Sequence, residues 1–184
     1  MNKHKLLLSG ALLIATQVFA LPALAATTVT AGDTSSGQVV FSGYVPGFVS
    51  GDTFTITGAG GVMTSQYTGS LSISPDGTFS TLAPIILEGH AYDGTGSTPL
   101  VGALTPAEWT VKSINTSNPI LQAALENVEL TDTVAGGKIT SISLGKIATA
   151  ANSVSLSLSM NKAITDEIAG QTFTVDVVMV ATAS

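Results

Sequence analysis

Two stretches of regularly alternating apolar and polar residues place the tightest limit on the fold. Residues 153–160 read SVSLSLSM, and near the end of the chain Phe173, Val175, Val177 and Met179 fall on one side of an extended backbone. Side chains of a strand point alternately to its two faces, so both stretches predict strands with one buried face. We expect the later strand to lie in the core sheet with a free edge that another strand must pair with.

The rest of the chain favours an all-β sandwich. It is rich in Thr, Ser, Val, Ala and Gly, with 5% aromatic residues, which suits short strands joined by tight turns. Residues 74–77 (SPDG) form a type I turn signal and predict a hairpin. Asn118 followed by Pro119 predicts one short helix over 118–126, crossing between the sheets. Further strands are expected at 37–45, 52–57, 68–74, 78–82, 109–114 and 138–144, the last with Ile142 and Leu144 on one face.

The N-terminal region divides into an export signal and a polar extension. Lys3 and Lys5 precede an apolar run, and residues 23–25 (ALA) match a signal-peptidase site, so residues 1–25 are expected to be a cleaved signal peptide. Residues 26–36 (ATTVTAGDTSS) carry too little apolar surface to join a core by themselves. We therefore expect an N-terminal extension at 26–36, a single domain at 37–184, and an exported protein.

Composition argues against several classes of function. The formal net charge is −6, with six Lys+Arg residues in all, so a basic surface for nucleic acid or anionic lipid is not expected. No cysteine is present, and no spacing suggests a metal site, a cofactor site or a catalytic triad. The Gly58–Gly61 run lacks the surrounding βαβ unit of a nucleotide loop and is interpreted as a plain loop. The chain is not expected to be an enzyme.

Residues 83–104 are expected to form a long surface excursion, because they contain two prolines and several glycines. Within it, His90 stands beside Glu88, Tyr92 and Asp93, and we interpret this group as part of a solvated loop rather than as a metal or acid/base site. Trp109 is expected to be a core anchor. A sugar platform that uses Trp109 and Tyr92 stays open as the alternative.

Two motifs give the chain a family resemblance. One is Ala31-Gly32-Asp33 followed by residues 37–45 (GQVVFSGYV), and the other is residues 169–177 (AGQTFTVDV), which enter the last strand. Together with the export signal, these motifs resemble subunits of bacterial chaperone/usher fimbriae, in the group that lacks cysteine. The resemblance covers both ends of the chain and its strand content.

The resemblance implies an immunoglobulin-like sandwich that lacks its final strand. The donor strand of one subunit, here carrying Val29, Ala31 and Gly32, would fill the groove of the next, beside the strand with Phe173, Val175, Val177 and Met179. The implied function is that of a structural fimbrial subunit, which contributes to cell adhesion at the cell surface. The implied partners are neighbouring subunits, a periplasmic chaperone and an outer-membrane usher, without insertion into the membrane. The alternative is a secreted or surface β-sandwich module that binds carbohydrate or another surface ligand.

Overall fold

The structure is a computed structural model that describes residues 32, 34–40, 53–64, 67–95, 100–164 and 171–184, with residues 34–40 described by their backbone. These residues form strands, one short α-helix and two 3₁₀ turns, as the sequence predicts for an all-β fold. The strands are β1 (Thr34–Val40), β2 (Phe54–Gly58), β3 (Leu71–Ile73), β4 (Phe79–Thr81), β5 (Ile85–Asp93), β6 (Leu100–Leu104), β7 (Ala107–Thr116), β8 (Val128–Asp132), β9 (Lys138–Thr140), β10 (Gly145–Ala151), β11 (Ser153–Met160) and β12 (Val175–Ala183).

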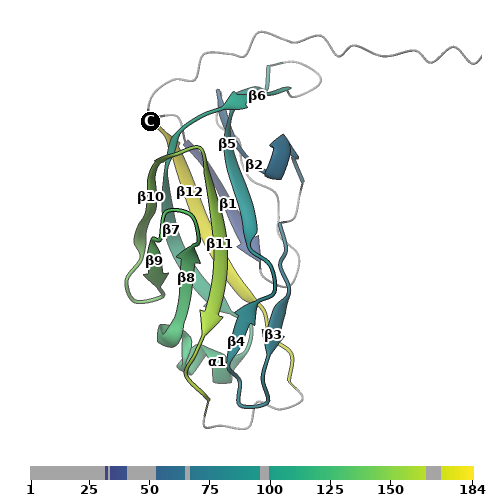
Figure 1. The fold of residues 1–184 in the computed structure, drawn as a ribbon, viewed down its shortest axis with the longest axis vertical. Coiled ribbons are helices and arrows are strands. Elements are labelled where there is room, and N and C mark those ends of the chain that lie inside the picture. The colour runs from purple at the N-terminus through teal and green to yellow at the C-terminus, as the bar shows by residue number, and fades with distance from the viewer. Residues whose placement is uncertain (1–31, 33, 41–52, 65–66, 96–99, 165–170) are drawn as a thin grey trace, which may run out of the picture.

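The strands form two sheets (Figure 1). The smaller sheet has the order β1-β12-β7-β10. The larger sheet has the order β2-β5-β11-β4-β3, with β6 added to β5, β8 to β11 and β9 to β8. Every strand pair within these sheets is antiparallel.

One hydrophobic core joins the two sheets. Trp109 and Val177 from the smaller sheet belong to the same buried cluster as Phe54 and Leu156 from the larger one. In β11 the apolar residues Val154, Leu156, Leu158 and Met160 are all buried, while the serines between them are partly exposed, so the alternation seen in the sequence is confirmed. Each such side chain contributes about 1.5–3 kcal/mol when it leaves water. The fold is therefore an all-β sandwich.

The predicted helix and hairpin are both present. α1 (Pro119–Ala123) begins at Asn118, whose side-chain Oδ1 accepts hydrogen bonds from the backbone N–H groups of Ile120 (2.9 Å) and Leu121 (3.1 Å). A 3₁₀ turn, η2 (Leu125–Asn127), follows and leads to β8, so this segment crosses from one sheet to the other. β3 and β4 are paired on either side of the 74–77 turn.

The expectation of a long surface excursion at 83–104 is wrong. Residues 85–93 form β5, which lies inside the larger sheet, and residues 100–104 form β6 at its edge. Gly89, which the sequence suggests is a loop residue, sits where strands approach closely. A Cβ atom there would lie 2.8 Å from the carbonyl oxygen of Thr105 and 3.0 Å from the Phe54 ring, so the position requires glycine.

The strand expected at 138–144 is shorter than predicted. β9 ends at Thr140, and a turn closed by the Ser143 N–H donating to the Thr140 carbonyl (3.1 Å) follows it. Ile142 and Leu144 lie beyond the end of β9 and are 77% and 43% exposed, so the prediction that they share one face of a strand is wrong. β8 and β10 were not predicted.

No helix in the described part of the chain is long and apolar enough to cross a bilayer. The expected signal peptide at 1–25 lies outside the described residues, as do residues 41–45 of the strand predicted at 37–45.

Candidate functional site

The subunit contact expected from the sequence involves the edge of β12 that is paired with β1 in this structure (Figure 1). The two strands are antiparallel and in continuous register, from Thr34 opposite Thr182 to Val40 opposite Asp176. The N–H of Gly32 donates to the Ala183 carbonyl at 3.1 Å and extends the pairing beyond the end of β1. Among the described strands, β1 is hydrogen-bonded to β12 alone.

β12 is an interior strand, because its other edge is paired with β7. That ladder runs from Val175 opposite Thr116 to Ala183 opposite Ala107. The edge that the sequence leaves for another strand is occupied in this structure by residues 34–40 of the same chain. Strand pairing relies on main-chain groups, so a polar segment such as Thr34-Ser35-Ser36 can form it without apolar side chains.

β1 spans the expected boundary between the extension at 26–36 and the domain at 37–184. β1 runs without interruption from Thr34 to Val40, so it includes the end of the predicted extension and the start of the predicted domain. Gly32, a predicted donor residue, lies next to β12, as its hydrogen bond to Ala183 shows. Val29 and Ala31, the other two, lie outside the described residues.

The inner face of the β12 segment is buried as expected. Val175, Val177 and Met179 are fully covered, and Phe173, just before the strand, is 8% exposed. The Phe173 ring packs against the Phe79 ring of β4, with 5.6 Å between the ring centres, and so joins the two sheets.

Side-chain hydrogen bonds fasten the entry to β12. The Ser117 Oγ accepts a bond from the Thr174 N–H at 3.0 Å, and the Ser117 N–H donates to the Thr174 carbonyl at 3.3 Å. The Asn118 side chain, which also caps α1, donates to the Gln171 side-chain oxygen at 2.8 Å. These bonds fix the start of the last strand to the end of β7.

The two candidate ligand-contacting residues have different environments. Trp109 has no exposed surface, and its indole N–H donates to the Ala151 carbonyl at 2.8 Å. A ring with no exposed surface cannot stack on a sugar, so the interpretation of Trp109 as a contact residue is corrected in favour of the core anchor. Tyr92 is partly exposed near the end of β5.

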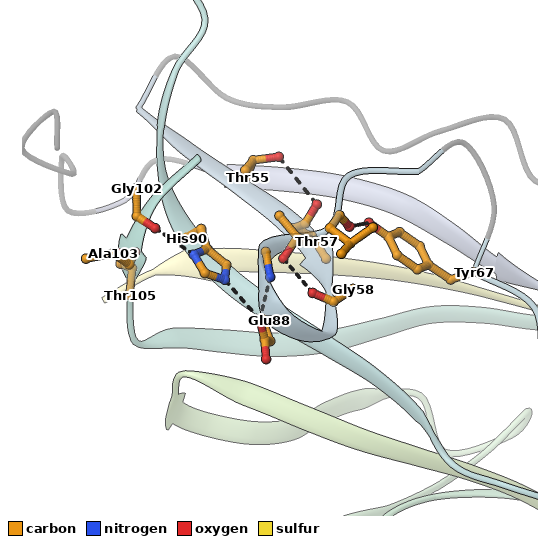
Figure 2. Close-up of polar contacts among 12 residues, drawn as sticks. Thr55, Thr57, Gly58, Tyr67, Glu88, His90, Gly102, Ala103 and Thr105 are labelled. Carbon is orange, nitrogen blue, oxygen red and sulfur yellow. Dashed lines mark hydrogen bonds and ion pairs between the residues drawn. The ribbon is translucent and has the colours of Figure 1, made fainter. Parts of the chain in front are cut away.

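Glu88 and His90 lie in a strand rather than in a solvated loop, which corrects the interpretation from the sequence. Two residues apart on β5, they point to the same face, and His90 is 7% exposed. Figure 2 shows the His90 ring between Gly102 and Glu88. The ring Nδ1 is 2.8 Å from the Gly102 carbonyl, and Nε2 is 3.0 Å from Glu88 Oε2. Glu88 and His90 are two residues apart, a spacing that places both side chains on the same face of a strand, so a strand prediction for residues 85–93 would have indicated the pair.

The Glu88 carboxylate is held in its charged form. Burial raises its pKa, but the hydrogen bond from His90 and those from the backbone N–H groups of Gly60 and Gly61 outweigh this, and the net pKa lies below the usual value. Both nitrogens of the His90 ring are engaged, Nδ1 with the Gly102 carbonyl and Nε2 with Glu88. Within the described ranges, no cluster of three His, Cys, Asp or Glu residues could hold a metal ion.

Two cavities lie beside the segment that connects β2 to β3. One, of about 690 Å³, is bordered by Gly58, Val62 and Tyr67 on one side and by Leu82 and Ile86 on the other. The second, of about 470 Å³, lies between residues 68–73 and the Gln171–Phe173 entry to β12. Val62, Leu82 and Ile86 are 58%, 69% and 44% exposed, so the first cavity has an apolar rim.

Comparison of the chain with protein-family models, with curated proteins and with solved structures found no match.

Proposed function

We propose that the chain is a structural subunit of a fimbrium, polymerised by donor-strand exchange and contributing to cell adhesion. The observation that carries the proposal is the position of β1. It is the N-terminal strand of the described chain, it forms the outer edge of the smaller sheet, and it is hydrogen-bonded only to β12 within the part of the chain described. In this proposal the sandwich without β1 is an incomplete immunoglobulin-like domain, and β1 is its donor strand.

The β1–β12 ladder is of a kind that can form within one chain or between two. Its seven residue pairs use main-chain groups, and the same groups are available when β1 comes from another copy. Residues 41–53 separate β1 from β2 in the sequence, a length that allows the strand to pair with its own body or with a neighbour. Exchange from one copy to the next is a head-to-tail contact, which gives an open filament when the rotation between copies does not close into a ring.

Pairing of β1 with β12 of the same chain would be the state of the subunit before assembly. A tethered strand acts at an effective concentration of about millimolar, so an isolated copy should favour its own β1. A periplasmic chaperone and an outer-membrane usher are the partners expected to direct the strand to a neighbouring subunit. This part of the proposal relies on the family resemblance and on the export signal expected at residues 1–25.

Deletion of residues 34–40 in cells that carry the chain with its neighbouring genes tests the proposal. Surface material sheared from the parent cells should contain filaments and should give a ladder of bands on a gel run without boiling. Cells with the deletion should yield neither, because each subunit would lack its donor strand. A secreted, monomeric parent protein that forms no filaments would contradict the proposal and would favour the surface binding module, for which partly exposed Tyr92 is the remaining candidate contact.

A further inference from the structure

The Glu88–His90 pair lies where the β5–β6 ladder is irregular. β5 and β6 pair at His90 with Leu104 and again at Tyr92 with Val101, and the register shifts between these two pairs. Gly102 falls within the shifted part of β6. Its carbonyl accepts a hydrogen bond from the His90 ring at 2.8 Å, so a side-chain bond connects the two strands where the main-chain ladder is interrupted.

The same pair also fixes the 3₁₀ turn η1 (Ala59–Gly61) to β5. The Gly61 N–H donates to Glu88 Oε2 at 3.0 Å, the oxygen that lies 3.0 Å from His90 Nε2 (Figure 2). Three elements, η1, β5 and β6, are thus connected through one carboxylate oxygen and one imidazole ring.

Hydrogen-bond chemistry sets the protonation that this arrangement requires. The Gly102 carbonyl can only accept, so Nδ1 must carry a proton. Glu88 Oε2 receives the Gly61 N–H and belongs to a carboxylate that is ionised, so Nε2 must carry a proton as well. The arrangement is therefore complete only when the ring is an imidazolium.

On β5 the titratable groups that share a strand face with His90 are Glu88 and Tyr92, two residues to either side, and of these Glu88 is bonded to the ring. On β2 the residue opposite His90 is Thr55, and on β6 it is Leu104. η1 contributes Ala59, Gly60 and Gly61, and β6 consists of Leu100, Val101, Gly102, Ala103 and Leu104, none of which titrates. The protonation of the His90 ring consequently decides whether the Gly102 carbonyl and the Glu88 carboxylate both accept a hydrogen bond from it.

We propose that Glu88 and His90 form a proton-dependent clasp that holds η1 and β6 on β5. When the imidazolium loses a proton, one ring nitrogen becomes an acceptor that faces another acceptor, so either the Gly102 or the Glu88 contact opens. The clasp therefore loosens when the ring is deprotonated at higher pH. It also weakens in strong acid, when Glu88 is protonated. Gly58 and Ala59, next to the clasp, border the 690 Å³ cavity.

Amide hydrogen exchange of Gly61, expressed as a protection factor to remove the intrinsic effect of pH, tests the clasp in the full mature chain. The protection factor should fall about tenfold between pH 5.5 and pH 8.5, the change expected for loss of one charge-assisted hydrogen bond. The Val177 amide, in the core of β12, should stay far better protected than Gly61 at both pH values, and so exclude global unfolding as the route by which Gly61 exchanges. Nitrogen NMR of the ring at pH 5.5 should show a proton on both Nδ1 and Nε2.

Glu88→Gln and Asp93→Asn are matched variants, since each removes one carboxylate from β5. The side-chain amide that Glu88→Gln introduces can donate to a neutral ring and still accept from Gly61, so the pH dependence of Gly61 protection should fall below about threefold. Asp93 accepts its hydrogen bonds from Thr95, away from His90, so Asp93→Asn should keep the tenfold change. Amide protection that is constant from pH 5.5 to 8.5 both at Gly61 and in β6, or a ring with a single proton at pH 5.5, would overturn the proposal, whether or not a variant folds.

Discussion

The backbone of Val39 lies directly opposite that of Val177, in the ladder that joins β1 to β12. The two residues are far apart in the sequence, yet their alignment closes the edge of a strand whose inner face is buried. Since one residue of slip would turn every side chain of a strand to the other face, the register is tightly specified where that face is in the core. β1 is therefore a defined part of the sandwich in this structure, whether one chain or two supply it in the cell.

The first prediction concerns the two faces of β12. Val177 has no exposed surface, whereas Val178 is partly exposed. Val177→Asp should cost several kcal/mol because it buries an unpaired charge, a large part of the roughly 5–15 kcal/mol that stabilises a domain. Val178→Asp should cost less than about 1 kcal/mol. Urea unfolding followed by circular dichroism would measure both, and equal losses would mean that the assigned faces are incorrect.

The second prediction concerns the single tryptophan. Trp109→Phe removes the donor to the Ala151 carbonyl and leaves a space in the core, so the free energy of unfolding should fall by about 2–4 kcal/mol. Tyr92→Phe is the control, because it changes an aromatic residue that is partly exposed and should cost under about 1 kcal/mol. A loss from Trp109→Phe no greater than that of the control would contradict the role of Trp109 as a core anchor.

The third prediction uses two aspartates whose pKa values shift in opposite directions. Burial raises the pKa of Asp176, so the folded state binds its proton more tightly than the unfolded state does. Stability contributed by this proton is present at low pH and is lost as the pH rises through the window that begins near pH 4 and ends at the raised value. Asp176→Asn should therefore raise the melting temperature at pH 7 and leave it nearly unchanged at pH 3.

Asp76 provides the opposite case in the β3–β4 turn. The Thr78 hydroxyl and then the Thr78 N–H donate to its carboxylate, at 2.8 and 3.1 Å, and lower its pKa. Its contribution is present above the unfolded-state pKa and is lost as the pH falls through the lower folded-state value. Asp76→Asn should lower the melting temperature at pH 7, so a change of the same sign in both variants would contradict the assigned environments.

Local patterns explain why several elements could be predicted from the sequence. The alternation at 153–160 identifies β11, the Asn118-Pro119 pair identifies the start of α1, and the 74–77 turn identifies the β3–β4 hairpin. In each case the physical signal lies within a few residues: one buried face, one cap and one turn. The burial of Val175, Val177 and Met179 could be predicted for the same reason.

The remaining features depend on contacts between distant segments. From the sequence alone, Gly89 favours a loop. In the structure Phe54 and Thr105 pack against it, and a side chain at this position in β5 would collide with them. The Glu88–His90 group is interpreted as part of a loop for the same reason, because its contact depends on both residues lying on one face of β5. The pairing of β1 with β12 could not be derived either, because main-chain hydrogen bonds form with polar residues such as Ser35 and Ser36 and leave no mark in the hydrophobic pattern.

Disulfide trapping across β1 and β12 tests the proposed exchange most directly. The chain has no cysteine of its own, and Gln38 lies opposite Val178 at a position where β12 is partly exposed. Directly opposed residues have Cβ atoms about 4.5–5.5 Å apart, so a Gln38→Cys, Val178→Cys chain should form the bond after little adjustment. Gln38→Cys with Thr182→Cys is the control, since four residues along a strand add about 13 Å.

Surface material from cells that express the Gln38→Cys, Val178→Cys chain would be boiled and separated without reducing agent. If β1 of one subunit completes the next, the bonds join neighbouring chains, and a ladder of covalent oligomers should appear that reducing agent collapses to a single band. The control chain should give only that single band. A disulfide found entirely within single chains of the surface material would contradict donor-strand exchange.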